Sequence, residues 1–262
     1  MDTLAARAAY DEHLRRNPTG AQGEEVEKDA HVVRMLWDGG WAGVLWSDFG
    51  GLTSEEVDAA VAAEIARFSR RGTPWEWKWH AYDEPADLPQ RLVAAGLRRG
   101  EDEALMVAEL GDLDLDAPAP EGVRLEPVTD QAGVERLVTV HDAVFGGDHS
   151  GIGRHVASGL AADPPTCAAV VAMAGDEPIS SGRVELHHGT PFASIWGGGT
   201  VAAWRGRGVF RSLISQRAAV AAGLGFRYLQ VDASDESKPI LLRLGFQAIT
   251  TTTPYVFTPP RP

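Results

Sequence analysis

One long segment of this chain has no acidic residue. The sequence has 262 residues and a formal net charge of -13 at pH 7, yet no Asp or Glu occurs between Leu186 and Gln230. Arginines in such an acid-free window of an acidic protein indicate a site for a polyanion. The window contains five of them: Arg205, Arg207, Arg211, Arg217 and Arg227.

Cysteine is almost absent as well. The single cysteine, Cys167, excludes an internal disulfide framework and any zinc site made of several cysteines. It opens the apolar run that ends at Met173, where we expect a buried structural thiol. His187 and His188 are adjacent, so on a strand they face opposite sides and do not form a metal pair. We therefore expect no bound metal.

The chain also lacks the long apolar segments of membrane proteins. No run approaches about 18 consecutive apolar residues, and the N-terminus has no basic segment followed by an apolar one. These absences predict a cytoplasmic protein without a membrane partner. The net negative charge repels a phosphate backbone at long range, so we also expect no nucleic acid partner.

The acidity is confined to the first part of the chain. Residues 1–122 contain 12 basic and 25 acidic residues, whereas residues 123–262 contain 12 basic and 12 acidic residues. The segment from Gly111 to Gly122 is rich in Pro, Gly and acids, which is typical of a solvated linker. We place the boundary in it and predict two domains, 1–115 and 116–262.

The second half has the pattern of a mixed α/β unit, with helical and strand periodicities in alternation. The predicted strands are at 122–127, 167–174, 179–187, 192–196, 228–231, 248–252 and 255–257. The predicted helices are at 131–145, after the polar segment 146–153 with an end near 163, at 209–224 and near 237–244.

The first half contains a weaker copy of the same order. At an offset of 149 residues, the segment from Leu92 to Leu97 aligns with 241–246, and the segment from Trp77 to Tyr82 aligns with 226–231. Such self-similarity predicts duplication of one structural unit. Six tryptophans at strand-like spacing in this half predict a sheet core. They are Trp37, Trp41, Trp46, Trp75, Trp77 and Trp79.

The two copies differ at the loop before the long helix. The second copy has Arg205-Gly206-Arg207-Gly208, whereas the first has Thr53-Ser54-Glu55-Glu56-Val57-Asp58. Thr53 and Glu56 form a capping-box pattern, so this helix start satisfies its own N–H groups. The carboxylates would also repel phosphate, so we expect only the second copy to bind a phosphate ligand.

With this order of elements, the second half resembles the GNAT superfamily of acyl-CoA-dependent N-acyltransferases. The segment 205–210 is similar to the family's pyrophosphate loop, Arg/Gln-x-x-Gly-x-Gly/Ala, except that Phe210 replaces the final small residue. The segment 241–246 is similar to the family's closing Leu-Tyr-x-Lys-x-Gly-Phe. The resemblance covers residues 122–257. It implies an α/β GNAT fold with a mixed, mostly antiparallel central sheet flanked by helices, duplicated with a reduced N-terminal copy.

The resemblance implies acetyl-CoA as the acyl donor. Its pyrophosphate would meet the N–H groups at the helix start, helped by the helix dipole. We expect the Phe210 side chain to point inward, so that its N–H still donates. The expected coenzyme-binding residues are Val201, Ala202, Ala203, Arg205, Gly206, Arg207, Gly208, Val209, Phe210, Arg211, Ser234 and Ser237.

The triple glycine from Gly197 to Gly199 fits the same resemblance. Glycine within a strand marks a bulge or a close backbone approach. In the family, the strand splays here and its free edge pairs with the pantetheine arm, and an N–H near Val201 would hold the oxyanion. The alternative is a flexible loop without a ligand.

The catalytic groups are less well defined. The family's thiolate-protonating Tyr corresponds to Leu241, which cannot donate a proton, and Tyr228 and Tyr255 are alternatives by strand order. As general base we expect Asp232 first and Glu185 second. Each of these carboxylates has an alternative role as a turn residue or a solvated strand position.

We expect the acceptor pocket between the first two helices and the sheet. The segment from Phe145 to Gly153 is a candidate lid, and Phe145, Trp196 and Tyr255 are the candidate substrate-binding residues. The sequence thus predicts an acetyl-CoA-dependent N-acetyltransferase for a small-molecule or peptide amine, as a monomer or homodimer. A non-catalytic acyl-CoA-binding or regulatory module is the alternative. A nucleotide-triphosphate enzyme is excluded because the loop lacks Gly-Lys-Ser/Thr.

Overall fold

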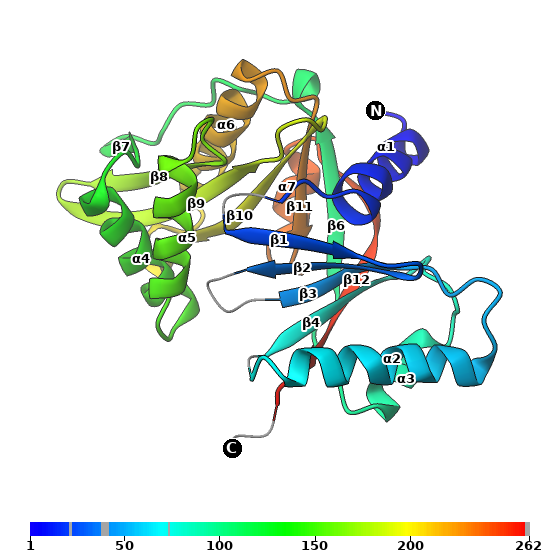
Figure 1. The fold of residues 1–262 in the computed structure, drawn as a ribbon. Helices are drawn as coiled ribbons and strands as arrows, with labels where there is room; N and C mark the ends of the chain where they lie inside the picture. Colours follow the sequence, from blue (N-terminus) through cyan, green and yellow to red (C-terminus); the bar gives the residue numbers. More distant parts are fainter. Residues whose placement is uncertain (21–22, 38–41, 73, 260–262) are drawn as a thin grey trace. The chain divides into compact units, whose positions relative to one another are not determined.

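The computed structural model of the chain forms two compact units (Figure 1). It describes residues 1–20, 23–37, 42–72 and 74–259. Unit 1 contains residue 1 and the segments 106–231 and 239–247. Unit 2 contains the segments 2–105 and 232–238 and the chain from residue 248 onward.

Unit 1 is a sheet with helices on both faces. Its strands follow the order β6-β11-β10-β9-β8-β7, and only β10 and β11 are shown to pair in parallel. Helices α4 and α5 pack against one face of β8, and α6 packs against the other. The elements are β6 (Glu103–Glu109), η2 (Leu110–Asp112), β7 (Val123–Pro127), α4 (Gln131–Phe145), α5 (Ser150–Ala161), β8 (Cys167–Ala174), β9 (Glu177–Leu186), β10 (Phe192–Thr200), η3 (Ala202–Trp204), α6 (Val209–Gly223), β11 (Tyr228–Ala233) and α7 (Lys238–Arg243).

Strand β8 explains why its sequence is apolar at almost every position. Cys167 and Val171 pack with α4 and α5, whereas Val170 and Ala172 pack with α6. Successive side chains of a strand point to opposite faces, so a strand covered on both sides needs a continuous apolar run. Cys167 is buried as expected, and burial raises the pKa of its thiol to about 12.

The element order predicted for the second half is confirmed, with shifts at some ends. Helix α4 and strand β8 have the predicted bounds. Strand β10 continues beyond Trp196 to Thr200 and includes the triple glycine. The two predicted terminal strands are one strand, β12 (Gln247–Phe257).

Unit 2 repeats this architecture in a smaller form. Its strands follow the order β1-β2-β3-β4-β12, β5 pairs with β12, and β3 and β4 are parallel. Helices α2 and α3 lie below the sheet in Figure 1 and α1 lies above it. The elements are α1 (Thr3–Tyr10), η1 (Asp11–Arg16), β1 (Glu24–Lys28), β2 (Val32–Trp37), β3 (Ala42–Ser47), α2 (Ser54–Ser69), β4 (Trp75–His80), α3 (Leu88–Ala94) and β5 (Arg98–Arg99).

The tryptophans of β4 form the core of unit 2. Trp75 and Trp77 are each 1% exposed and pack with Phe68 of α2, and Trp79 packs against the same cluster. The prediction of a tryptophan sheet core is confirmed for these three. Trp37 and Trp46 are only half-buried, and Trp41 lies outside the described residues.

The last strand of each repeat belongs to the other repeat's unit. Strand β12, from the second half of the chain, pairs antiparallel with β4 and β5 of unit 2. Strand β6, from the first half, continues into unit 1, where it lies next to β11. The compact units therefore differ from contiguous halves, and the domains 1–115 and 116–262 stay a prediction about the repeats.

The segment 111–122 is mostly exposed, as expected of a linker, but it is anchored on α6. Ala117 is buried, and its N–H donates a hydrogen bond to Ser215 Oγ at 2.9 Å. Arg211 forms an ion pair with Asp114 at 3.2 Å. The acids of this segment thus neutralise part of the positive charge of the acid-free window.

The predicted repeat is visible in the element order. The series β3-α2-β4-α3 of unit 2 matches β10-α6-β11-α7, and each series contains one parallel strand pair. The offset of 149 residues does not hold for the strands, because β4 begins at Trp75 and β11 begins at Tyr228. Phe226, which the sequence alignment placed over Trp77, precedes β11.

Candidate functional site

The site in unit 1 is built around the splay of β10 and β11. These parallel strands pair only from Phe192 to Ser194 of β10, opposite Tyr228 to Gln230. Strand β10 then continues to Thr200 while remaining paired with β9 on its other side. The two strands therefore diverge after Ser194 of β10.

The triple glycine lies in this diverging part of β10 and forms a bulge. The register between β10 and β9 shifts between Trp196 and Gly199. A Cβ on Gly197 would lie 2.5 Å from His141 Cε1, and one on Gly198 would lie 2.9 Å from Phe210 Cε2. Such distances leave no room for a side chain. The predicted bulge is present, and the segment is a strand and not a loop, with helices α4 and α6 packed against it; ligand binding there stays a prediction.

Loop 205–208 leads directly into helix α6. Gly206 and Gly208 have φ values of +73° and +89°, a conformation that favours glycine. Gly208 is the N-cap of α6 and no side chain caps this helix start, so the first N–H groups, of Val209, Phe210 and Arg211, have no partner among the described residues. Free N–H groups at the positive end of a helix are suited to a phosphate.

The five arginines of the acid-free window have different roles. Arg211 forms an ion pair with Asp114, and Arg227 forms one with Glu109. Arg217 is buried, with its guanidinium packed against Gly182 of β9. Arg205 donates to the Thr200 carbonyl and Arg207 lies over the Trp204 ring, and neither has a carboxylate partner in the described part of the chain. Only Arg205 and Arg207 therefore offer an unpaired positive charge at the loop.

Four other coenzyme candidates are Val201, Ala202, Ala203 and Phe210. The Phe210 ring packs against Gly198, so the side chain points inward as expected. The Val201 N–H donates to the Ile179 carbonyl at 2.9 Å and is therefore not free for an oxyanion. Ala202 and Ala203 begin the short helix η3, and their side chains are exposed.

Glu185, the second candidate base, is held in an ion-pair cluster. His155 Nε2 lies 3.1 Å from its Oε1, and Arg183 Nε lies 2.9 Å from the same oxygen. Burial acts to raise the pKa of Glu185, but Arg183, His155 and His187 outweigh it and lower the pKa to about 2. A carboxylate with so low a pKa accepts a proton weakly at neutral pH.

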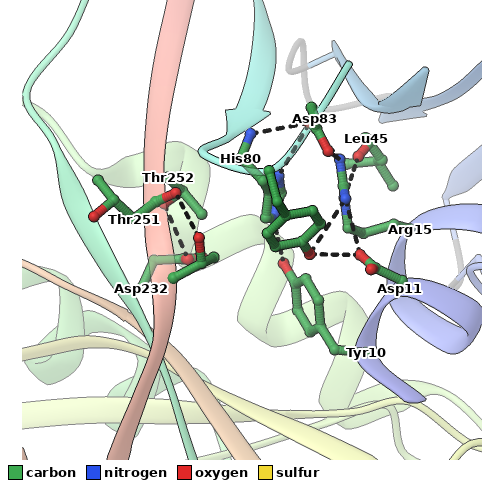
Figure 2. A network of polar contacts seen from close by, with 11 residues as sticks. Tyr10, Asp11, Arg15, Leu45, His80, Asp83, Asp232, Thr251 and Thr252 are labelled. Carbon is green, nitrogen blue, oxygen red and sulfur yellow. Dashed lines mark hydrogen bonds and ion pairs between the residues drawn. The ribbon is translucent and has the colours of Figure 1, made fainter. Parts of the chain in front are cut away.

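Asp232, the first candidate base, belongs to unit 2. Its side chain is 1% exposed and forms an ion pair with Lys78, and Thr252 Oγ1 lies 3.4 Å from Asp232 Oδ1 (Figure 2). Ser234 and Ser237, also of unit 2, lie in one turn with their hydroxyl oxygens 3.3 Å apart. The site of unit 1 contains none of these three, and their roles stay predictions.

The candidate tyrosines are core residues. Tyr255 is 2% exposed and lies in the tryptophan core of unit 2. Tyr228 is 4% exposed, and its ring centroid lies 5.0 Å from that of Phe192 in unit 1. Leu241, at the family's Tyr position, is also buried. These contacts give Tyr255 a packing role, and its substrate contact stays a prediction.

A histidine that sequence reasoning did not select lies at the bulge. His141 of α4 is 3% exposed, and its Nε2 has no hydrogen-bond partner among the described residues. Burial, with the positive charge of Arg183 and the neighbouring His149, lowers the pKa of His141 to about 4, so the ring is neutral at pH 7. The Phe145 ring packs edge-on to the His141 ring, with 5.4 Å between the ring centroids. His141 and Phe145 are four residues apart, which places both on one face of a helix, and this spacing is the sequence signal that could have selected His141.

The candidate substrate contacts in unit 1 surround the same bulge. Phe145 is 53% exposed and ends α4, and Trp196 is half-buried in β10 directly before the triple glycine. The segment from Gly146 to His149 connects α4 to α5. Phe145 thus lies against Gly199 of the bulge and Trp196 directly precedes the triple glycine, whereas Tyr255 is not part of unit 1.

The corresponding place in unit 2 is occupied by the chain itself. Arg15 donates from Nε to the Leu45 carbonyl at 3.0 Å and from Nη2 to Asp83 at 2.6 and 2.8 Å (Figure 2). Leu45 is the bulge residue of β3, since the register with β2 shifts there. The Arg15 guanidinium thus binds the bulge of β3, the strand that corresponds to β10 of unit 1.

The start of α2 is also closed. The predicted capping box is present, with the Thr53 hydroxyl accepting from the Glu56 N–H and the Glu56 carboxylate accepting from the Thr53 N–H. Arg91 of α3 reaches across to Asp58 and to the Ser54 carbonyl. These contacts explain why the first copy has no open helix start for an anion.

The described residues contain neither a metal-binding group nor a membrane-spanning helix. No group of three or more His, Cys, Asp or Glu side chains there has an arrangement that could hold a metal ion. None of the helices in the described ranges combines the length and apolarity that a membrane span requires.

Comparison with known proteins rests on structure. No protein-family model and no curated protein matches the sequence. A GCN5-related N-acetyltransferase from Kribbella flavida superposes with a TM-score of 0.70 at 18% identity, covering 100% of this chain and 98% of that one. A conserved protein of unknown function from Staphylococcus epidermidis superposes with a TM-score of 0.69 at 15% identity, covering 95% of this chain and 98% of that one.

A third similar structure has a tandem architecture. It is a tandem GNAT protein from the clavulanic acid biosynthesis pathway, with a TM-score of 0.62 at 13% identity, covering 99% of this chain and 95% of that one. Coverage of nearly the whole chain includes both the open copy in unit 1 and the closed copy in unit 2. The chain therefore has the GNAT fold in a tandem arrangement.

Proposed function

We propose that this chain is an acetyl-CoA-dependent N-acetyltransferase acting on a primary amine, with its catalytic site in unit 1. One observation carries the proposal: the uncapped, acid-free start of α6 follows, in the chain, a strand that diverges from its parallel neighbour after Ser194. A helix start of this kind suits a pyrophosphate, and the backbone between two diverging strands suits the amide groups of a pantetheine arm.

In the proposed reaction, the neutral amine attacks the thioester carbonyl carbon. A C–N bond forms, the carbonyl oxygen becomes an oxyanion, and the C–S bond then breaks to release the thiolate, which takes a proton. We assign the oxyanion contact to the N–H of Gly197 or Gly198, because these bulge residues have no register partner in β9. The Val201 N–H, which we first expected in this role, is already bonded.

Two carboxylates are candidates for removing the proton from the amine. Asp232 and Glu185 stay the candidate bases, yet each is held in an ion pair. About 1 in 10³ of a lysine-like amine is neutral at pH 7 without help, so solvent can supply the neutral form slowly. The proposed setting is the cytoplasm, with a small-molecule or peptide amine as acceptor and the chain as a monomer or homodimer.

The test is binding of acetyl-CoA by titration calorimetry. We expect micromolar affinity, and Gly208→Glu should weaken it by about 100-fold, because a carboxylate at the helix start replaces charge-assisted hydrogen bonds with repulsion. Gly51→Glu is the matched control: Gly51 has a φ of +83° with open space around it, in the loop before α2. Absence of binding by the unmodified chain would disprove the proposal.

A non-catalytic acyl-CoA-binding module is the second candidate, and the buried Leu241 with the two ion-paired carboxylates favours it. Thiol release from acetyl-CoA with a panel of amines separates the two functions. Cys167 is buried with a raised pKa, so it adds little background to a thiol-reagent assay. Binding without release on any amine supports the module.

A further inference from the structure

Unit 1 contains more buried positive than negative charge next to the β10 bulge. The side chain of Arg183 is 11% exposed, and Arg217 is 2% exposed. Arg183 Nε bonds to Glu185, whereas Arg217 donates only to the carbonyls of Leu213, Arg183 and Trp196. The two guanidinium groups lie on opposite faces of the sheet, and Arg183 lies with Glu185 on the face that α4 covers. Because Arg183 uses only Nε for Glu185, both of its Nη groups can still bind an acceptor on that face.

The unsatisfied polar atoms of this cluster converge on one residue. A Cβ placed on Gly197 would lie 2.7 Å from His141 Nε2 and 3.2 Å from Arg183 Nη1. Neither His141 Nε2 nor the two Nη atoms of Arg183 has a hydrogen-bond partner among the residues that the structure describes. Arg183 and His141 come from different elements, β9 and α4, and meet on the face of the strand that also carries Phe145.

We infer that Arg183 and His141 bind a carboxylate of the reacting molecules beside the β10 bulge, so that the amine acceptor is an amino acid or a related compound with a carboxylate near its amine. This inference rests on the proposed function. The two free Nη groups of Arg183 match a carboxylate in a planar, bidentate geometry, and a neutral imidazole with a proton on Nε2 donates a further hydrogen bond.

The same chemistry has a second source, because the acyl chain of the donor can also carry a carboxylate, as in succinyl-CoA. The position of Arg183 favours the acceptor. His141 and Phe145 lie on α4, on the face of β10 opposite to Phe210 and Arg217 of α6, and α6 is the helix to which we assign the coenzyme. The experiment below distinguishes the two sources.

Binding is measured first, independently of turnover. Amino acids are titrated into the full chain in the presence of acetyl-CoA, and each is compared with its own carboxamide. The Tm of the protein is followed at constant ionic strength. We expect at least one acid to raise the Tm while its carboxamide does not. Arg183→Gln should weaken the binding of that acid by about 10- to 100-fold, as expected for loss of a charged, bidentate partner.

Two variants separate binding from folding. Arg183→Lys keeps the charge and should retain part of the affinity, which a purely structural role would not predict. Arg124→Gln, at an exposed position of β7, is the matched control and should leave both Tm and affinity unchanged. Equal Tm shifts for acids and carboxamides, or shifts that persist in Arg183→Gln, would overturn the inference for the acceptor.

The donor arm compares succinyl-CoA with acetyl-CoA by calorimetry. If only succinyl-CoA binds more tightly, by about 10-fold or more, and this gain is lost in Arg183→Gln, the donor carries the carboxylate. Thiol release is then assayed on the same panel. Carboxylate-dependent binding without any release would contradict the proposed catalysis while supporting the carboxylate site, so the two failures are distinguishable.

Discussion

Burial decides the protonation of His141. Its ring lies between α4 and the bulge of β10, next to the positive charge of Arg183, and its pKa is lowered from the usual 6.5 to about 4. The folded protein therefore keeps this side chain neutral at a pH at which an unfolded chain would protonate it. This difference links the geometry of the site to the stability of the fold.

The stability of the protein should consequently fall as the pH is lowered from 6.5 to 4. In that range the unfolded chain binds a proton at His141 and the folded chain does not, so protons favour unfolding; above 6.5 both states are neutral there. The loss attributable to His141 is on the order of 3 kcal/mol, from a shift of about 2.5 pKa units. Urea unfolding at several pH values measures it.

The variant His141→Asn should reduce this slope. It should not abolish it, because burial also lowers the pKa of His80 in unit 2 well below its usual range, and His80 contributes in the same direction. An unchanged slope between pH 6.5 and 4 in His141→Asn would contradict a neutral buried ring.

At the scale of single residues, the sequence identified the loop and missed its surroundings. Arg205 to Gly208 was recognisable from local order, because glycines and a following helix are short-range signals. His141 was not, since its importance depends on Arg183 and Gly197, which are distant in sequence. Asp232 was chosen by its place after a strand, whereas its partner Lys78 lies in the other repeat.

Among the elements, β10 shows why a strand can contain three consecutive glycines. Two helices press side chains against it from opposite faces: His141 toward Gly197, Phe210 toward Gly198, and Val144 toward Gly199. The glycines thus allow a close approach of helices to the strand, at the place where its register with β9 shifts. The sequence predicted a close approach but assigned it to the coenzyme alone.

Substitution of Gly197 by Ala should therefore be costly. Gly197 has a φ of +59°, and its added Cβ would lie 2.5 Å from the His141 ring. Gly175→Ala is the control, because Gly175 has the same φ of +59° with nothing within 4 Å. We expect a loss of about 1 kcal/mol for the control, from backbone strain, and about 3 kcal/mol for Gly197→Ala, from strain plus overpacking.

Urea unfolding of the two variants measures the difference, and acetyl-CoA titration reports whether the bulge is disturbed. Weaker binding in Gly197→Ala with normal binding in Gly175→Ala is expected. Equal losses of stability in the two variants would mean that the His141 ring moves aside at little cost.

For the whole molecule, the main feature is the exchange of terminal strands between the repeats. Unit 2 contains β12 from the second half of the chain, and unit 1 contains the later part of β6 from the first half. Val256 pairs with Glu76 and Tyr255 lies in the tryptophan core, so the C-terminal strand is part of the unit 2 interior. Neither repeat holds all the strands of its own unit.

Fragments 1–115 and 116–262 should therefore not fold separately. Fragment 1–115 lacks β12, which leaves β4 paired only with β3 and removes Tyr255 from the core that contains Trp75 and Trp77. We expect neither fragment to melt cooperatively in calorimetry, and co-expression to restore a folded complex. The fragment 106–247, which keeps the segments of unit 1, is the control and should melt cooperatively. Cooperative melting of each half alone would contradict this prediction.

The sequence by itself determined the order of elements, the α/β class, the repeat, and the contrast between an uncapped helix start after Gly208 and a capped one after Thr53. These features depend on periodicity, turn residues and caps, which act over a few residues. Only the tertiary structure decided that Arg15 closes the first copy, that β12 belongs to unit 2, and that His141 meets Arg183 at Gly197. Such contacts join residues far apart in the chain, and packing and electrostatic complementarity select them, which no local pattern encodes.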